Sequence, residues 1–217
     1  MHIFDQADWM FDPLDEALTA LDPRWHQRRS IAAALRRANL LMLTHDMDGA
    51  TLDTIEQALA SVQALLDTQP ALAGRAAHSE QMGLQGPANR LALEMSPVIG
   101  RSAGSSLRMT LTLSDGRIAA RVDPEWIHEG PPGWMHGGIV AALFDEFLGL
   151  AQGELGPNPG KTGTLTVRYL APTPLNVPLA FAVKSAWQEG RKRTIAGALT
   201  ADGVETARAE AIFVVPP

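Results

Sequence analysis

Gly137, Gly138 and Asp145 are the residues whose types and spacing best suggest chemistry. Two consecutive glycines at the start of a helix expose backbone N–H groups without an intrahelical partner, and the helix dipole adds to their attraction for negative charge. Asp145 follows Gly137 by eight residues, in a mostly apolar run. Such an N–H group stabilises an oxyanion by about 3 kcal/mol, and the carboxylate can act as a nucleophile or a general base.

The spacing between the two groups limits how they can work together. Eight residues of helix span about 12 Å, so one small reacting group cannot touch Gly137 and Asp145 of the same helix. The pair therefore predicts a site shared by two copies of the chain, with antiparallel helices at a two-fold interface and two equivalent sites. Glu146 points about 100° away from Asp145; we expect a structural role for it and keep it as the reserve acid.

The composition excludes several other kinds of site. The chain of 217 residues has no Cys, which excludes disulfides, thiol nucleophiles and Cys-ligated zinc. Its six His show no spacing of the HExxH type, so no metal site is predicted. Apolar residues make up 46% and charged residues 19% of the chain, as in ordinary globular proteins.

The net charge of −6 resides in the first third of the chain. Residues 1–80 contain 6 Lys and Arg against 12 Asp and Glu, and residues 81–217 contain 12 of each. This distribution gives no basic surface for nucleic acid. The N-terminus lacks a signal-peptide pattern, and no apolar run approaches the roughly 18 residues of a membrane span. We therefore expect a cytoplasmic protein without membrane contact.

Residues 1–80 are expected to form a helical extension. Asp22-Pro23 is a helix start signal, and apolar residues recur at helical spacing from about residue 25 to 43 and from about 51 to 68. The stripe of the first helix contains Ile31, Leu35, Ala38 and Met42, and that of the second contains Leu52, Ile55, Leu59, Val62 and Leu66. We interpret both stripes as packing surfaces; a lid or an oligomer contact near a site is the alternative.

After residue 106 the hydrophobic pattern changes from helical to alternating. A strand over residues 107–114 and a return strand over about 117–122 are joined by Asp115-Gly116, a two-residue hairpin signal. The Gly- and Pro-rich loop 129–135 then leads into a helix expected from about residue 136 to 152.

Four more strands follow, and the last three are joined by turns at Glu189-Gly190 and Asp202-Gly203. Short connections require antiparallel neighbours, so the pattern predicts a hairpin, one helix and a four-strand meander. A single apolar helix needs a sheet to cover it. We therefore predict an α+β fold in which an antiparallel six-stranded sheet wraps around one central helix.

Several motifs together carry a family resemblance. They are Glu129-Gly130-Pro131-Pro132-Gly133, His136-Gly137-Gly138, Asp145, and the strand Thr162-Gly163-Thr164-Leu165-Thr166-Val167-Arg168-Tyr169-Leu170-Ala171-Pro172. The chain from about residue 85 resembles the hot-dog-fold acyl-CoA thioesterases, in particular the PaaI-like (phenylacetate-pathway type) branch of the 4-hydroxybenzoyl-CoA thioesterase superfamily. Residues 81–217 would form the hot-dog domain, and residues 1–80 inherit nothing from the resemblance.

The resemblance implies hydrolysis of an acyl-CoA thioester to a free acid and coenzyme A, without a cofactor. Gly137 would donate its N–H to the thioester carbonyl oxygen, and Asp145 of the partner subunit would act as nucleophile or general base. Thr162 matches a Ser or Thr that helps to orient the water, and His136 would shape the helix start. The implied assembly is a homodimer, and pairing of dimers into tetramers stays open.

Further residues are candidates for substrate binding. Gly138 lies beside the proposed donor, and Trp134 would line an acyl pocket. Arg191 and Arg193, at a predicted hairpin tip, would contact the phosphates of coenzyme A.

One position departs from the family pattern. Some relatives carry an Asn six residues before the His, where this chain has Gly130. Either Gly137 works with fewer helpers, or His128 or Glu129 takes the place of the Asn. A non-catalytic protein that binds acyl-CoA or senses a ligand is therefore the alternative function. A hot-dog hydratase with His128 or His136 as its base ranks third.

Overall fold

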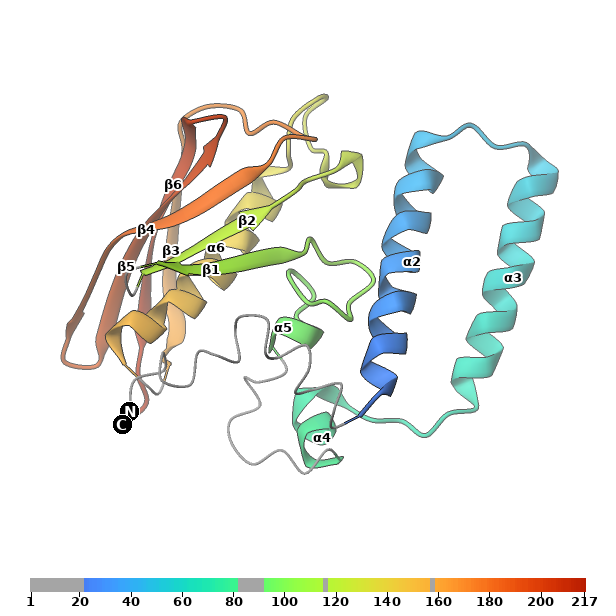
Figure 1. Cartoon of the computed structure of the whole chain (residues 1–217), viewed down its shortest axis with the longest axis horizontal. Helices are drawn as coiled ribbons and strands as arrows, with labels where there is room; N and C mark the ends of the chain where they lie inside the picture. The colour runs from blue at the N-terminus through green and yellow to red at the C-terminus, as the bar shows by residue number, and fades with distance from the viewer. Residues whose placement is uncertain (1–21, 82–91, 115–116, 157–158) are drawn as a thin grey trace.

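The computed structural model describes residues 22–81, 92–114, 117–156 and 159–217. Figure 1 shows a curved sheet packed around one helix, with two long helices standing beside it. No helix among the described residues is long and apolar enough to cross a bilayer.

The sheet has six strands in the order β1-β2-β4-β5-β6-β3, and every neighbouring pair is antiparallel. The strands are β1 Met109–Ser114, β2 Arg117–Val122, β3 Lys161–Tyr169, β4 Leu179–Glu189, β5 Lys192–Ala201 and β6 Val204–Val214. The six predicted strands are thus confirmed. Asp202 and Gly203 form the turn between β5 and β6 with φ of 48° and 79°, as a two-residue hairpin requires. The turn predicted at Asp115-Gly116 lies outside the described residues.

Helix α6, Gly137–Ala151, lies against the concave face of the sheet (Figure 1). Its buried side chains are Val140, Leu143, Phe144, Phe147, Leu148 and Ala151. Phe144 meets Phe181 of β4 edge-on, with ring centroids 5.1 Å apart. Gly197 of β5 allows this close packing, because a Cβ there would lie 2.9 Å from the Leu148 side chain. The predicted hot-dog arrangement is therefore confirmed.

The position of β3 corrects one expectation. Strand β3 pairs with β6 and not with β4, so the predicted four-strand meander is wrong and only β4, β5 and β6 form one. The nine residues 170–178, which include Pro172, Pro174 and Pro178, are long enough to cross from one part of the sheet to another. As a result β3 is an edge strand, and one side of its backbone has no strand partner among the residues that the structure describes.

The two long N-terminal helices form at the expected places. They are α2, Arg24–Thr44, and α3, Gly49–Asp67, and together we call them the helical arm. Asp48 caps α3 by accepting a hydrogen bond from the Thr51 N–H over 2.7 Å. Two short helices follow, α4 Gly74–Gln81 and α5 Ala92–Met95, so the predicted domain boundary falls at the end of α4.

The apolar stripes of the helical arm are not buried as predicted. Helix α2 buries Trp25, Ala32 and Leu40, which lie on a neighbouring face, whereas Ile31 and Leu35 are exposed. Helix α3 has no buried residue. The periodicity identified the helices correctly but not the surfaces that pack within one chain.

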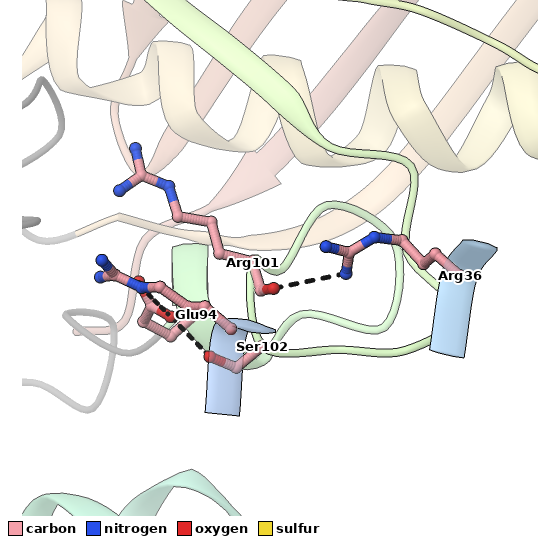
Figure 2. Close-up of polar contacts among 5 residues, drawn as sticks. Arg36, Glu94, Arg101 and Ser102 are labelled. Carbon is pink, nitrogen blue, oxygen red and sulfur yellow. Dashed lines mark hydrogen bonds and ion pairs between the residues drawn. The ribbon is translucent and has the colours of Figure 1, made fainter. Parts of the chain in front are cut away.

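Polar contacts fix α2 to residues 94–103. Arg29 forms an ion pair with Glu94, which is 1% exposed and also accepts a hydrogen bond from Ser102. The Arg36 guanidinium donates to the carbonyl oxygens of Ala103, over 2.6 Å, and of Arg101. Figure 2 shows the Arg36–Arg101 and Glu94–Ser102 contacts side by side. Because a buried carboxylate without its partner is costly, this cluster holds α2 firmly in place.

Candidate active site

The loop before α6 is held by its own polar side chains. In the short 3-10 helix η3, Trp126–His128, the Nδ1 atom of His128 accepts a hydrogen bond from the Glu125 N–H over 2.9 Å. His128 is buried, and this desolvation lowers its pKa. Glu129 accepts from the Gly133 N–H over 2.6 Å. Both side chains have structural partners, which disfavours them as substitutes for the missing Asn.

The residue His136 caps α6 in an unusual way that affects both glycines. Its Nδ1 accepts a hydrogen bond from the Gly138 N–H over 2.9 Å. The predicted substrate-binding N–H of Gly138 is therefore occupied. Among the described residues none accepts a hydrogen bond from the Gly137 N–H, so Gly137 presents the free donor at the positive end of the helix.

Tyr169 is a site residue whose role the sequence did not reveal. Its hydroxyl donates to the Gly137 carbonyl oxygen over 2.7 Å, which ties the end of β3 to the first turn of α6. Two signals were present: Tyr169 is the one Tyr in the chain, and it ends the alternating strand that carries the motif. Its bond fixes the peptide next to the free donor.

Asp145 and Thr162, two of the predicted site residues, lie in contact. The Thr162 hydroxyl donates to Oδ1 of Asp145 over 2.9 Å. A β-bulge between Thr162 and Thr164 turns Thr162 toward α6, opposite buried Phe213 of β6. Asp145 is half-buried and Thr162 is exposed, so the carboxylate stays within reach of a ligand.

The structure does not bring Gly137 and Asp145 of one chain together. They lie on one straight helix, eight residues and hence about 12 Å apart along its axis. Each instead has its own partner on β3, Tyr169 for Gly137 and Thr162 for Asp145. One chain thus presents two separate half-sites along the same helix–strand contact.

Glu146, the reserve acid, has a structural contact. It accepts a hydrogen bond from the Ser96 hydroxyl over 2.5 Å. The same Ser96 oxygen accepts from the N–H groups of Val98 and Ile99. Glu146 therefore anchors residues 96–99 to α6, which supports the expected structural role.

The predicted substrate-binding side chains differ in exposure. Trp134 is 43% exposed, and its backbone forms an isolated β-bridge with Pro174. Arg191 is exposed and donates from Nε to the Val215 carbonyl. Arg193, by contrast, is 4% exposed and donates to Gln188, and burial lowers its pKa. Because the Arg193 side chain is buried, it is poorly placed for the predicted contact with the phosphates of coenzyme A.

The absence of an Asn at position 130 has a local cause. A Cβ on Gly130 would lie 2.7 Å from the His136 Cα and 3.0 Å from its Cβ, closer than real Cβ contacts. The loop therefore approaches the helix start too closely for any side chain at this position. The described residues also contain no group of three or more His, Asp or Glu placed to hold a metal ion.

Known proteins with this architecture were compared with the chain. Neither protein-family models nor curated proteins give a match. Among solved structures, a protein from Streptococcus mutans UA159 bound to acetyl CoA matches half of this chain and 89% of its own, at 20% identity and a TM-score of 0.46. A hypothetical thioesterase from Streptococcus pneumoniae TIGR4 with coenzyme A matches half of this chain and 88% of its own, at 22% identity and a TM-score of 0.45.

A third structure is much more similar. It is the crystal structure of a thioesterase superfamily protein, with 31% sequence identity and a TM-score of 0.71. The match covers 94% of that protein and 86% of this chain, so it reaches beyond the sheet and α6 into the N-terminal helices. On this identity and coverage, the chain belongs to the thioesterase superfamily.

Proposed function

We propose that this chain is an acyl-CoA thioesterase of the PaaI-like type and that it works as a homodimer. It hydrolyses an acyl-CoA thioester to a free acid and coenzyme A. Membership of the thioesterase superfamily supports the reaction class, and the His136-Gly137-Gly138 and Thr162–Pro172 motifs support the branch.

The hydrogen bond between Thr162 and Asp145 is the observation that carries the proposal. It holds a half-buried carboxylate in one orientation, on a helix whose first residue presents a free N–H. A carboxylate in a fixed orientation and a free N–H at a helix start are the two groups that thioester hydrolysis requires.

The dimer follows from the separation of these two groups. Strand β3 has an unpaired edge, and both half-sites lie where β3 meets α6. Pairing of β3 with β3 of a second copy would satisfy the edge and place the two α6 helices antiparallel. Gly137 of one subunit then faces Asp145 of the other, and the two-fold axis generates two equal sites.

The roles of the two groups follow from the chemistry of the thioester. Attack on the carbonyl carbon converts the carbonyl oxygen to an oxyanion, which the Gly137 N–H stabilises. With Asp145 as general base, water loses a proton to the carboxylate and forms the new C–O bond. The C–S bond then breaks, and the proton passes from Asp145 to the sulfur of coenzyme A. With Asp145 as nucleophile, its carboxylate bonds to the carbonyl carbon and the C–S bond breaks, which releases the coenzyme A thiolate and leaves a mixed anhydride. Water then hydrolyses the anhydride to the free acid and restores the Asp145 carboxylate.

The first experiment is a hydrolysis screen with short, long, branched and aryl acyl-CoAs. We expect turnover by the wild type and a loss of 10²-fold to 10⁴-fold, roughly the worth of a positioned base, in Asp145→Asn, which keeps the size of the side chain. Equal turnover by the wild type and Asp145→Asn would exclude the assigned mechanism. Tight binding of acyl-CoA without turnover by the wild type would favour the non-catalytic alternative.

A mixing experiment tests the shared site directly. Asp145→Asn and Gly137→Pro each remove one half-site, the latter by removing the N–H. A hybrid dimer of the two variants has one site with both native groups and one with neither. Activity should therefore return on mixing and re-forming the dimers. A mixture as inactive as its parents would show that both groups act within one subunit or that neither has the proposed role.

A further inference from the structure

Helix α3 carries an apolar stripe that no described residue covers. None of its 19 residues is buried, and Leu59, Val62 and Leu66 are 50%, 51% and 63% exposed. The stripe keeps helical spacing over the whole helix, which is the pattern of a face that packs against another element. Single exposed apolar residues are ordinary, but a continuous stripe marks an interaction surface.

Helix α2 has a matching stripe next to the face that it buries. Ile31, Leu35 and Met42 are spaced to lie on one line along the helix, and they are 61%, 44% and 45% exposed. The helix cannot rotate to bury this stripe, because the Glu94 and Arg36 contacts drawn in Figure 2 fix its other side to residues 94–103. Helix α2 is therefore held in one orientation, with its apolar stripe exposed.

The two helices carry opposite charges. Helix α2 contains Arg24, Arg28, Arg29, Arg36 and Arg37 and no acidic residue. Helix α3 contains Asp53, Glu56 and Asp67 and no Lys or Arg. Arg29 and Arg36 face residues 94–103, so Arg24, Arg28 and Arg37 are the cations of α2 that an acidic α3 could meet. Contact between an α2 and an α3 would thus bury two apolar stripes between helices of opposite charge.

Within one chain this contact is not made. The two helices run side by side but stand apart, and they barely contact each other (Figure 1). A groove of about 730 Å³ lies where α2 begins and α3 ends, lined by Ile31 and Leu35 of α2, by Leu66 of α3 and by residues 69–72 that follow α3. The first part of the α2 stripe and the last residue of the α3 stripe therefore border the same groove.

We propose that α3 packs into the groove of a second copy of this chain, against α2 of that copy, and that the second copy does the same in return. The α2 and α3 helices have similar lengths, 21 and 19 residues, and opposite charges, and each carries an exposed apolar stripe. A two-fold pair of arms fills both grooves at once and forms a four-helix bundle. An unrelated partner would have to supply the same stripe and the same charge, which a second copy already has.

This contact is separate from the proposed active site. Helix α2 lies beside the residues that lead into β1 and contacts η3, whereas β3, with Thr162 and Tyr169, is at the opposite edge of the sheet (Figure 1). Where both contacts form, dimers made through β3 are joined in pairs through their arms.

Cysteine cross-linking tests the contact, because the chain has no native Cys. The full-length chain is made with Leu59→Cys and, in turn, Ile31→Cys, Leu35→Cys or Met42→Cys, and is oxidised in dilute solution. We expect a disulfide-linked dimer on a non-reducing gel for at least one pair, and none when Gln57→Cys, on the opposite face of α3, replaces Leu59→Cys. An intrachain disulfide, or no disulfide with any of the three pairs, would overturn the proposal.

Light scattering gives a second, independent test. Leu59→Glu combined with Leu66→Glu should halve the native mass, while Gln57→Glu combined with Ala64→Glu, which adds the same charge at the same spacing to the opposite face, should leave it unchanged. Circular dichroism verifies that both variants keep their helices. An unchanged mass for the variant with Leu59→Glu and Leu66→Glu would contradict the proposed contact between the arms. Hydrolysis assays on the same samples separate this contact from the proposed function. The native mass reports on the arm contact whether or not the protein hydrolyses acyl-CoA.

Discussion

Thr162 donates a hydrogen bond to Asp145 over 2.9 Å, across 17 positions of sequence, and so joins the edge strand β3 to helix α6. Among the described residues none donates to the second oxygen of this carboxylate. The bond thus fixes one oxygen and leaves the other available, which is the arrangement a base or nucleophile needs.

Thr162→Ala removes the orienting hydroxyl and leaves the carboxylate in place. We expect kcat for acyl-CoA hydrolysis to fall by about 10-fold to 100-fold, since loss of orientation has effects of this order. Stability should change little, because Thr162 is exposed. Thr162→Ser keeps the hydroxyl and is the matched control. Full activity in the Ala variant, measured beside the Ser variant, would contradict the orienting role.

Gly137→Pro tests the oxyanion donor with little damage to the helix. Position 137 is the first residue of α6, where Pro is tolerated, and His136 before it is already extended with ψ of 125°. Because Pro has no N–H, we expect kcat to fall by about 10²-fold to 10³-fold while the melting temperature is largely kept.

Gly137→Ala is the control for this variant, since it keeps the N–H and its Cβ would meet Tyr169 at an ordinary 3.4 Å. Gly149→Ala, with open space around its Cβ, is a second control in the same helix. Both should retain most activity. A folded and fully active Gly137→Pro enzyme would show that another group stabilises the oxyanion.

Gly130→Asn introduces the residue that some relatives carry. Its Cβ would collide with the backbone of His136, so we expect destabilisation by about 1–3 kcal/mol, as for overpacked sites, and no gain in activity. Denaturant unfolding and the acyl-CoA assay measure the two effects. A variant that is as stable as the wild type and more active would show that the loop can move aside.

Stability should fall in mild acid because of His128. Burial lowers its pKa from the ordinary value of 6.5, so the unfolded chain binds a proton at a higher pH than the folded chain does. The penalty is absent well above pH 6.5, grows as the pH falls through 6.5, and levels off below the folded pKa. Buried His78 acts in the same direction.

His128→Asn removes this proton and keeps an acceptor for the Glu125 N–H. The free energy of unfolding should then depend less steeply on pH between 7 and 5, by at most about 1.4 kcal/mol per pH unit. His26→Asn, at an exposed position, is the matched control. Identical slopes for the wild type and His128→Asn would show that another group causes the acid sensitivity.

The sequence predicted those features that depend on neighbours along the chain. Asp202-Gly203 forms a turn through its local backbone angles, and it lies where expected. The apolar run of α6 identified the central helix for the same reason. Asp145 and Thr162 were singled out by their motif, and the structure places them in contact.

Other features depend on contacts that no local pattern encodes. Strict alternation would put Thr162 on the face opposite Tyr169, and only the bulge before Thr164 brings both toward α6. The place of β3 beside β6 results from a long crossing connection rather than a turn. The burial of Trp25 in place of Ile31 reflects which face of α2 meets residues 94–103.

The unpaired edge of β3 also affects the tendency of the chain to aggregate before it forms a dimer. A free edge rich in Thr can pair with other extended segments and start aggregation. Exposed Lys161 and Arg168 stand near the two ends of this strand, and charged side chains on an edge strand discourage its pairing with apolar segments of other proteins. We therefore expect these two cations to limit non-specific pairing of the free edge until the chain meets its partner.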